Sequence, residues 1–296
     1  MTLKKIIARL DAYEKLIRLD KPVGTLLLLW PTMWALWFCS FGYPDPRVVL
    51  IFVVGTVLMR SAGCAINDYA DRDFDGHVER TRARPIATGA IGPNEALWVA
   101  AVLAAAAFLL VLQLNRLTIL LSVAALFLAA SYPFTKRFLA LPQAYLGIAF
   151  GFGIPMAYAA HAGTVPWQAW LLLLGNVFWA IAYDTEYAMV DREDDRKIGI
   201  KTSALLFGRL DVAMVMLFQA LFIAVLVAIG IEYQRGAAYF CGVAVAAALA
   251  AWQYRMIRDR SREACFRAFR QNNWLGGAVF AGLFVDFLLI GSSSAH

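Results

Sequence analysis

The sequence predicts an all-α integral membrane protein, folded as a bundle of about nine transmembrane helices around a central cavity. Hydrophobic residues make up 61% of the 296 residues, whereas soluble domains hold about 45–50%. The mean hydropathy is correspondingly high, at +0.63. About nine apolar stretches approach the roughly 20 residues that a helix needs to cross the hydrocarbon layer, and Lys and Arg collect between alternate stretches.

The N-terminal segment, residues 1–22, differs from the rest of the chain. Apolar residues such as Leu3, Ile6 and Leu10 recur at helical spacing, with Lys and Arg between them. This pattern is typical of an amphipathic helix that lies in the membrane interface. Because the segment also contains acidic residues, which mitochondrial presequences avoid, a bacterial inner membrane is the simpler location.

The remainder, residues 23–296, is interpreted as one membrane-embedded domain. Its predicted spans are residues 23–42, 48–67, 95–113, 117–133, 140–160, 166–183, 211–231, 236–254 and 273–291. A shift of 120 residues superimposes two of the aspartates after the second span on two of those after the sixth. This shift indicates two four-helix repeats, residues 23–139 and 140–254, with helix 273–291 added.

The distribution of positive charge predicts the orientation. With the N-terminus in the cytoplasm, 23 of the 27 Lys and Arg residues fall in cytoplasmic segments and three in external ones, as the positive-inside rule requires. The C-terminus is then external, and the cavity opens to the cytoplasmic face, where the long charged loops lie. Topology and anionic lipid headgroups account for the net charge of +6, so no nucleic-acid partner is expected.

Two aspartate clusters follow apolar spans on the predicted cytoplasmic side. Residues 67–75 are NDYADRDFD, and residues 184–195 are DTEYAMVDREDD. Residues three, four, seven or eleven apart share a face of a helix. The two faces carry Arg60, Asn67, Asp71 and Asp75, with Asp68 close by, and Asp184, Asp191 and Asp195. Carboxylates crowded near hydrocarbon are costly unless a cation neutralises them, so the clusters predict a metal site.

The ligand types suggest which metal and which substrate. An all-oxygen set suits a hard cation such as Mg²⁺ rather than zinc, and Mg²⁺ commonly binds phosphate oxygens as well. Basic residues can neutralise the remaining phosphate charge; the candidates are Arg80, Arg84, Lys136 and Lys201. A diphosphate at the membrane boundary with its tail in lipid points to a polyprenyl diphosphate, which leaves an allylic carbocation when its diphosphate departs. No P-loop motif is present, which disfavours nucleotide hydrolysis.

Other charged residues have simpler interpretations. Acids that point away from the two faces are expected to be solvated: Asp73, Glu79, Glu186, Glu193 and Asp194. Arg60 lies about 16 Å deeper along the helix than Asp71. A buried arginine needs an anion, which is either a structural carboxylate or an anionic co-substrate. Asp286, in the last span, is expected to be structural or to reach outward.

At these residues the chain resembles the UbiA superfamily of intramembrane aromatic prenyltransferases, and within it the 4-hydroxybenzoate polyprenyltransferases of ubiquinone biosynthesis. The first family motif, NDxxDxxxD, begins at Asn67. The second, DxxxD with another Asp seven residues before it, begins at Asp191. Similar stretches also run through residues 18–36, 59–89, 132–147 and 183–204.

The resemblance implies nine transmembrane helices around a cavity that opens sideways to the bilayer, and two Mg²⁺ ions. It implies metal and diphosphate ligands at Asn67, Asp68, Asp71, Asp75, Asp184, Asp191 and Asp195, with catalysis resting on Asp71, Asp75, Asp191 and Asp195. The diphosphate would also bind Arg80, Arg84, Lys136 and Lys201. Tyr132 would lie near the aromatic substrate, whose carboxylate would bind Arg60 or Arg137.

The implied reaction is an electrophilic aromatic substitution on 4-hydroxybenzoate, ortho to the phenol oxygen. Asp191 is the expected acceptor of the phenol proton, and apolar walls capped by loops 76–94 and 196–202 would keep water from the carbocation. Another acceptor, such as homogentisate, dihydroxynaphthoate or haem, would use the same metal site. A transporter or channel is a second class of function. The sequence leaves open the prenyl chain length and the oligomeric state.

Overall fold

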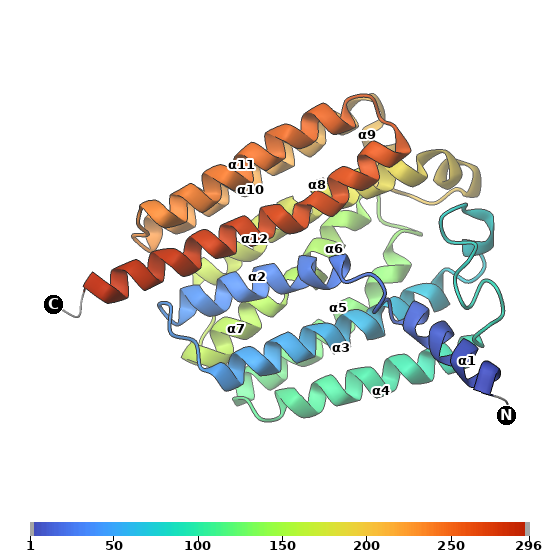
Figure 1. Cartoon of the computed structure of the whole chain (residues 1–296), viewed down its shortest axis with the longest axis horizontal. Helices are drawn as coiled ribbons and strands as arrows, with labels where there is room; N and C mark the ends of the chain where they lie inside the picture. Colours follow the sequence, from blue (N-terminus) through green and yellow to red (C-terminus); the bar gives the residue numbers. More distant parts are fainter. Residues whose placement is uncertain (1–2, 294–296) are drawn as a thin grey trace.

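The computed structural model of the chain describes residues 3–293 (Figure 1). Within this range it is all-helical, as predicted, and contains no strand. Residues 294–296, and with them the predicted external C-terminus, lie outside the described range. The helices are α1 (Leu3–Leu16), α2 (Val23–Cys39), α3 (Pro46–Ala70), η1 (Asp75–His77), α4 (Pro93–Val111), α5 (Arg116–Thr135), α6 (Pro142–Gly151), α7 (Gly153–Ala162), α8 (Trp167–Ile198), α9 (Ser203–Phe207), η2 (Gly208–Leu210), α10 (Asp211–Glu232), α11 (Ala237–Ile257) and α12 (Arg262–Ser293).

Six segments of the described chain are long and apolar enough to cross a membrane, which makes this a multi-pass membrane protein. They are α3, α4, α5, Ser203–Glu232, α11 and Arg262–Leu289. The other three predicted spans coincide with α2, the α6–α7 pair and the first part of α8. α2 has only 17 residues, and α8 carries Gln168 and Asn176 among its apolar side chains. By length and composition alone, six segments of the described chain qualify as crossings, and the predicted count of nine stays a prediction.

The predicted span 140–160 is split into two helices of ten residues each. Pro155 lacks the backbone amide that would bond to the carbonyl of Gly151, so a continuous helix would leave that bond unmade. Gly147 lets α6 approach α8 closely, since a Cβ there would lie 2.8 Å from Cα of Val177. Gly147 thus serves helix packing.

The core of the bundle is aromatic and lies where α2, α8 and α10 meet. Trp34, Trp179 and Phe222 are fully buried. The ring centroids of Trp179 lie 5.3 Å from those of both Trp34 and Phe222. Such stacked and tilted pairs add to the large apolar area that each ring buries. α8 is therefore held firmly by its neighbours at mid-height.

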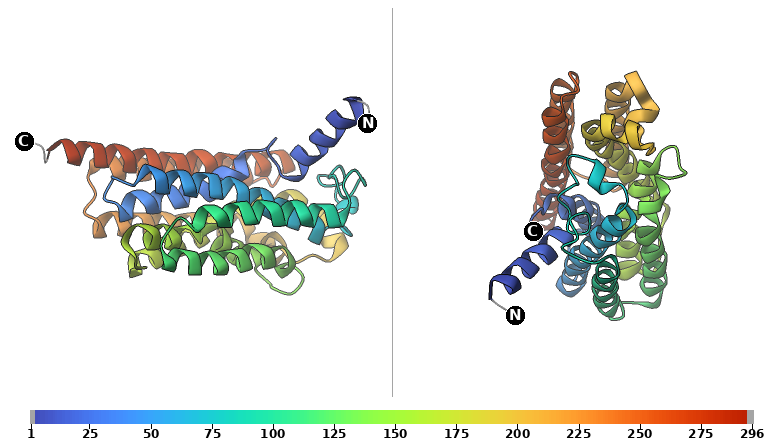
Figure 2. Two further views of the ribbon diagram at one scale, coloured as in Figure 1. Left: turned by 90° about the horizontal axis from the view of Figure 1, so that it is seen from below. Right: turned by 90° about the vertical axis from the view of Figure 1, so that its right-hand side faces the viewer.

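One end of the bundle gathers the polar segments. In Figure 1 the N-terminal helix, the loop after α3 and the α9 region lie together at the right-hand end, and the C-terminal end of α12 lies at the other. The end-on view in Figure 2 shows the loop after α3 crossing the end of the bundle. Both aspartate clusters thus belong to the same end, as their positions after spans two and six predict.

The opposite end holds Asp286 in a structural role. Its carboxylate accepts hydrogen bonds from the backbone amides of Gly236 at 3.0 Å and Tyr239 at 3.3 Å, where α11 begins. It also faces Arg235 at 3.7 Å. The first amides of a helix have no partner within the helix, so a carboxylate from α12 caps α11. This is the first of the two readings that the sequence allows for Asp286.

Candidate functional site

The first aspartate cluster lies at the end of α3 and in the loop that follows. Arg84 is the centre of the cluster: its guanidinium lies 2.8 Å from Asp75, 3.1 Å from Asp68 and 3.9 Å from Asp71. Asp68 also pairs with Arg18 at 2.9 Å. The side chains of all three aspartates are less than a tenth exposed. One cation from the loop therefore holds three buried carboxylates together.

The helical face predicted for this cluster is interrupted. α3 ends at Ala70, and Asp71 is its C-cap residue rather than part of a continuous helix. Asp75 lies in the short η1 helix. The backbone amide of Asp75 nevertheless donates to the carbonyl of Asp71 at 2.9 Å. This single helical bond keeps the two carboxylates one turn apart, so the spacing persists although the helix does not.

The second cluster lies on an unbroken helix. α8 continues to Ile198 and ends at Gly199, whose φ of 74° is the left-handed conformation that glycine adopts readily. Asp184, Asp191 and Asp195 thus share one face, as predicted. Arg80, from the loop after α3, donates to Asp191 at 2.9 Å, and its guanidinium carbon lies 4.4 Å from the ring centroid of Tyr187.

The two clusters face each other across shared cations. Arg80 belongs to the segment of the first cluster and binds an acid of the second. Lys136, at the end of α5, lies 2.5 Å from Asp71 in the first cluster. The charges of Arg80 and Lys136 also act on both Asp184 and Asp195 in the second. The structure therefore brings the predicted acids into one electrostatic unit.

Burial of two of the acids, together with the charge of neighbouring acids, raises their pKa values. Burial raises the pKa of Asp75, with a further contribution from the charge of Asp71. Burial, followed by the charge of Asp191, raises the pKa of Asp195 to about 7. Both effects disfavour the ionised form of a carboxyl group. The ionised form of these buried acids is therefore disfavoured, and a bound cation would favour it.

A cavity of about 900 Å³ opens beside the clusters. Its polar end is lined by Asn67, Asp68, Arg80, Arg84 and Asp184. The rest of its wall is mainly apolar and comes largely from α2, α3, α4, α5, α6 and α7, although arginines such as Arg18 and Arg60 also line it. The apolar residues include Phe52, Phe108, Leu126, Phe150, Phe152 and Met156. A volume of this order suits a ligand of substantial size. The cavity combines a charged end with a long apolar part.

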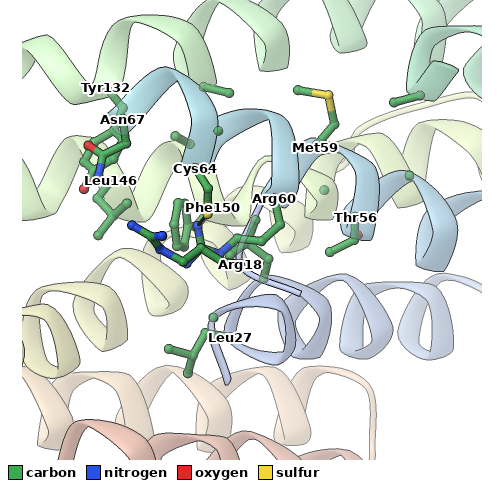
Figure 3. Close-up of a pocket in the computed structure, with 18 of the residues that line it drawn as sticks. Arg18, Leu27, Thr56, Met59, Arg60, Cys64, Asn67, Tyr132, Leu146 and Phe150 are labelled. Atoms are coloured by element: carbon green, nitrogen blue, oxygen red, sulfur yellow. Dashed lines mark hydrogen bonds between the residues drawn. The ribbon is translucent and has the colours of Figure 1, made fainter. Parts of the chain in front are cut away.

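Arg60 lies in the wall of this cavity (Figure 3). Its one hydrogen bond within the described chain goes to the sulfur of Cys64, one turn further along α3. Its Nε atom is buried without a hydrogen-bond partner, and no carboxylate pairs with it among residues 3–293. The sequence allows two partners for Arg60, a structural carboxylate or an anionic co-substrate. Within the described residues no carboxylate pairs with Arg60, so the first alternative is not met.

The other predicted residues are distributed unevenly. Tyr132 and Asn67 line the cavity, on the side away from Leu27 in Figure 3. Arg137 is exposed, donates to the carbonyl of Ala70 at 2.7 Å and lies outside the cavity lining. Lys201 is also exposed and donates to the carbonyl of Phe138 at 3.2 Å. Arg137 thus caps the end of α3, and Lys201 ties the loop after α8 to the loop after α5.

Arg18 is a site residue that the motif-based reasoning missed. It lies between α1 and α2 with a φ of 57°, a conformation uncommon outside glycine. Its side chain lines the cavity and holds Asp68. The available signal was its place at the start of the first stretch similar to the UbiA superfamily, residues 18–36. Its distance from both aspartate motifs concealed its role.

The donor chemistry of the site fits a hard divalent cation. All the acids offer oxygen atoms as ligands. Oδ1 of Asp71 is buried and has no hydrogen-bond partner, although the Lys136 ammonium lies 2.5 Å away as an ion pair. No three His, Cys, Asp or Glu side chains in the part of the chain that the structure describes converge closely enough to hold a metal on their own. Phosphate oxygens and water would have to complete the coordination.

Comparison with known proteins now adds to this geometry. The profile of the UbiA prenyltransferase family matches residues 28–282. The chain belongs to the UbiA prenyltransferase family. This confirms the resemblance seen in the aspartate motifs, and it agrees with a site that combines oxygen ligands, cations and an apolar cavity.

Relatives within the UbiA family match along almost their whole length. A protein of Azoarcus sp. (strain BH72) named 4-hydroxybenzoate octaprenyltransferase is 65% identical over 281 residues, which cover 95% of this chain and 98% of that protein. A protein of the same name from Nitrosospira multiformis is 62% identical over 285 residues, which cover 96% of this chain and 98% of that protein. The similarity therefore includes both aspartate clusters and every helix between them.

Solved UbiA structures share the fold. The apo structure of a UbiA homologue from Aeropyrum pernix K1 superimposes with a TM-score of 0.79 at 26% identity, covering 88% of this chain and 97% of that one. A homologue from Archaeoglobus fulgidus, described as bound to GPP and Mg²⁺, gives a TM-score of 0.69 at 17% identity and covers 94% and 99% of the two chains. The helical arrangement is thus that of the UbiA family.

Proposed function

We propose that this UbiA-family protein transfers a polyprenyl group from a polyprenyl diphosphate to the ring of 4-hydroxybenzoate, ortho to the phenol oxygen, in ubiquinone biosynthesis. The names of the relatives at 62% and 65% identity support this acceptor. The observation that carries the proposal is Arg60, a cavity-lining arginine with no carboxylate partner among residues 3–293. A carboxylate on an aromatic acceptor would supply that partner.

The charged end of the cavity is the proposed diphosphate site. Arg80 and Arg84 line this end of the cavity, and Lys136 pairs with Asp71 beside it. A diphosphate bound here would accept charge-assisted hydrogen bonds from these side chains, and bonds of this kind are strong. Lys201 lies further out and is proposed to act at the rim. The acids proposed to hold Mg²⁺ beside the diphosphate are Asp68, Asp71, Asp75, Asp184, Asp191 and Asp195, with the amide oxygen of Asn67. Bound Mg²⁺ would stabilise the negative charge that the leaving diphosphate gains.

The apolar part of the cavity is the proposed site of the prenyl chain and the aromatic ring. Arg60 precedes Asp71 by eleven residues on α3, which places it about 16 Å deeper. An acceptor anchored there by its carboxylate would put its ring between Arg60 and the diphosphate, beside Tyr132. Arg137 is not needed for this role, because its guanidinium caps α3 outside the cavity. The apolar walls would exclude water from the allylic carbocation.

Proton transfer is proposed to involve the second cluster. An aromatic ring attacks more readily when its phenol oxygen carries negative charge, so a carboxylate near the hydroxyl favours the reaction. Asp191 accepts a hydrogen bond from Arg80, which lines the charged end of the cavity. We propose that a carboxylate oxygen of Asp191 takes the phenol proton once Arg80 has turned to the diphosphate.

The proposed topology follows from the arrangement of the ends. α1 and the two site loops lie at one end of the bundle, and most Lys and Arg belong to the same end. We propose that this end faces the cytoplasm of a bacterial cell, with nine crossings of the inner membrane. α2, the α6–α7 pair and α8 would then cross together with the six long apolar helices.

The direct test is an assay of membranes that contain the protein. They are incubated with labelled 4-hydroxybenzoate, octaprenyl diphosphate and Mg²⁺, and the lipid extract is analysed for a prenylated product. We expect product with Mg²⁺ and none with a chelator. Matched reactions with homogentisate and dihydroxynaphthoate test the alternative acceptors. Product from one of these, but not from 4-hydroxybenzoate at any prenyl length, would contradict the proposal.

A further inference from the structure

A cluster of polar side chains lies buried behind α8, away from the cavity. We call it the amide cluster; its members are Trp179, Glu186, Gln219, Gln253 and Asn272, and each is at most 1% exposed. They come from four helices: α8, α10, α11 and α12. Glu186 was expected to be solvated, so its complete burial is a correction. Buried polar groups are costly unless hydrogen-bonded, so such a cluster calls for an explanation.

Asn272 of α12 connects the members of the amide cluster. Its amide nitrogen donates to Glu186 at 2.8 Å. Its amide oxygen accepts from the indole of Trp179 at 2.9 Å and from Gln219 at 3.2 Å. Gln219 donates in addition to Gln253 at 3.0 Å. Two residues of α8, seven positions apart, are thereby fixed to one side chain of α12.

The position of these two residues on α8 is informative. A helix turns by about 100° per residue, so Glu186 points nearly opposite to Asp184. Trp179 precedes Glu186 by two turns and shares its face. Asp184 and Tyr187, in contrast, line the cavity, and Asp191 lies on their side. The amide cluster therefore holds the back of α8 at the height of Asp184, the first acid of the second aspartate cluster, and Asp191 and Asp195 follow on later turns of the same helix.

Hydrogen bonds of defined direction can fix a rotation that apolar packing leaves loose. Apolar contacts are non-directional, whereas each bond of the amide cluster has a required angle. A rotation of α8 by one residue, about 100°, would remove Asp184 from the cavity and break the bonds of Trp179 and Glu186 together. We propose that the amide cluster sets the rotation of α8, and that Glu186 and Asn272 are positioning residues of the metal and diphosphate site.

This inference rests on the proposed function only for the identity of the ligand. The experiment therefore uses a binding measurement that needs no acceptor. Purified protein in detergent is heated with Mg²⁺ and inorganic diphosphate, and the Mg²⁺ concentration that gives half of the thermal stabilisation is determined. Prenyl transfer is measured in parallel at several Mg²⁺ concentrations.

Glu186→Met and Glu186→Gln are the informative pair. The amide of Gln keeps an oxygen that can accept from Asn272, whereas the Met side chain has a similar length and no such acceptor. We expect Met to raise the half-saturating Mg²⁺ concentration about tenfold or more, as removal of a group that orients metal ligands commonly does. Gln should stay within about twofold of the parent. Equal losses in both variants, or none in Met, would overturn the proposal.

Two further variants complete the test. Trp179→Phe keeps an aromatic ring but removes the indole donor to Asn272, together with part of the ring that packs against Trp34 and Phe222. It should raise the half-saturating concentration by about threefold, a fraction of the loss of a whole orienting contact. If Glu186→Met does not fold, Trp179→Phe takes its place as the test. An unchanged half-saturating Mg²⁺ concentration in Trp179→Phe would then count against the proposal. Tyr239→Phe is the control, because it removes a buried hydrogen bond between α11 and α10 and should leave Mg²⁺ dependence unchanged. Stabilisation by Mg²⁺ without any prenylated product would refute the proposed function and leave this inference standing.

Discussion

The two aspartate clusters have the same i,i+4 spacing but are built differently. In the first, α3 stops at Ala70, and the acids lie on a helix end and a 3₁₀ turn. In the second, they lie on α8, which runs unbroken to Ile198. The first cluster is held by three cations, Arg18, Arg84 and Lys136. Of Asp184, Asp191 and Asp195 in the second, only Asp191 has an ion-pair partner within the described residues; the partner is Arg80, from the loop after α3.

The difference separates a movable half of the site from a fixed half. Loop backbone opens more readily than a packed helix, and the loop after α3 carries Asp75, Arg80 and Arg84. α8 is fixed at its back by Asn272 and near its end by Arg192, which donates to the carbonyl of Ala204 at 3.0 Å and pairs with Asp211. Two aspartate clusters with equal spacing in sequence can therefore differ in how rigidly the backbone holds them.

The strongest test compares one acid from each cluster. Asp71→Asn and Asp191→Asn should each lower kcat by about 100-fold or more, because a charge that stabilises the leaving group contributes several kcal/mol. The measurement is turnover at saturating substrates and Mg²⁺. Asp73→Asn, an exposed residue beside the first cluster, is the control and should keep near-normal turnover. Near-normal turnover in either cluster variant would show that only one half of the site binds metal.

A second test concerns Arg60, which has no counterpart in the second half. The residue 120 positions further on is Ala180, which is fully buried. Arg60→Ala should raise KM for 4-hydroxybenzoate by roughly 10- to 100-fold, the value of a hydrogen bond to a charged group, and leave KM for the prenyl diphosphate unchanged. Steady-state kinetics with each substrate varied in turn would measure both. A change confined to the prenyl substrate would move Arg60 to the diphosphate site.

A third test compares the cations of the two halves. Arg84→Ala should raise KM for the prenyl diphosphate by about tenfold. It should also make the loop after α3 sensitive to protease, because Arg84 pairs with Asp75 in the loop and ties the loop to Asp68 and Asp71 at the end of α3. Lys201→Ala is the comparison from the second half. Its exposed ammonium contacts a carbonyl and is proposed to act only at the rim, so KM for the prenyl diphosphate should change by no more than about twofold. If protease sensitivity is unchanged in Arg84→Ala, the loop is not held by that guanidinium.

The smallest expected effect concerns the backbone. Gly199 ends α8 with a φ of 74°, so Gly199→Ala should cost about 1–2 kcal/mol and lower Tm by roughly 2–4 °C per kcal/mol. Gly76 has no positive φ and open space beside it. Gly76→Ala should therefore leave Tm unchanged. Thermal unfolding of both variants in the same detergent gives the comparison, and equal shifts would contradict the assignment of the fixed half to α8.

The sequence is most informative where composition and spacing act locally. Each predicted span contains helix, and the two clusters meet as their shared offset predicts. The end of α3 at Ala70 could not be predicted from the sequence. The i,i+4 spacing of Asp71 and Asp75 suggests a continuous helix, but a single backbone hydrogen bond keeps these residues one turn apart after the helix has ended. α12 begins at Arg262, eleven residues before the predicted span, because polar Asn272 and small Cys265 and Ala268 are buried against neighbouring helices.

Contacts between distant segments account for most of what the sequence did not reveal. Arg18 meets Asp68 across 50 residues, and Asn272 meets Glu186 across 86. Neither spacing carries a periodic signal, since only tertiary packing brings these residues together. The sequence predicts Lys136 and Lys201 equally as cations for the diphosphate, but of the two only Lys136 contacts an acid in the structure. Charge alone therefore cannot rank the candidate cations.

The length of α8 has a consequence for how substrates and products separate. Its 32 residues span about 48 Å, whereas the hydrocarbon layer is about 30 Å thick. If α8 crosses the bilayer as proposed, its last turns, with Asp191 and Asp195, would stand at the depth of the lipid headgroups. Under the proposed function, a lipid-borne diphosphate meets the site without leaving its own layer. The released diphosphate passes directly into water, and the prenylated ring stays in the lipid, so the two products part by solubility.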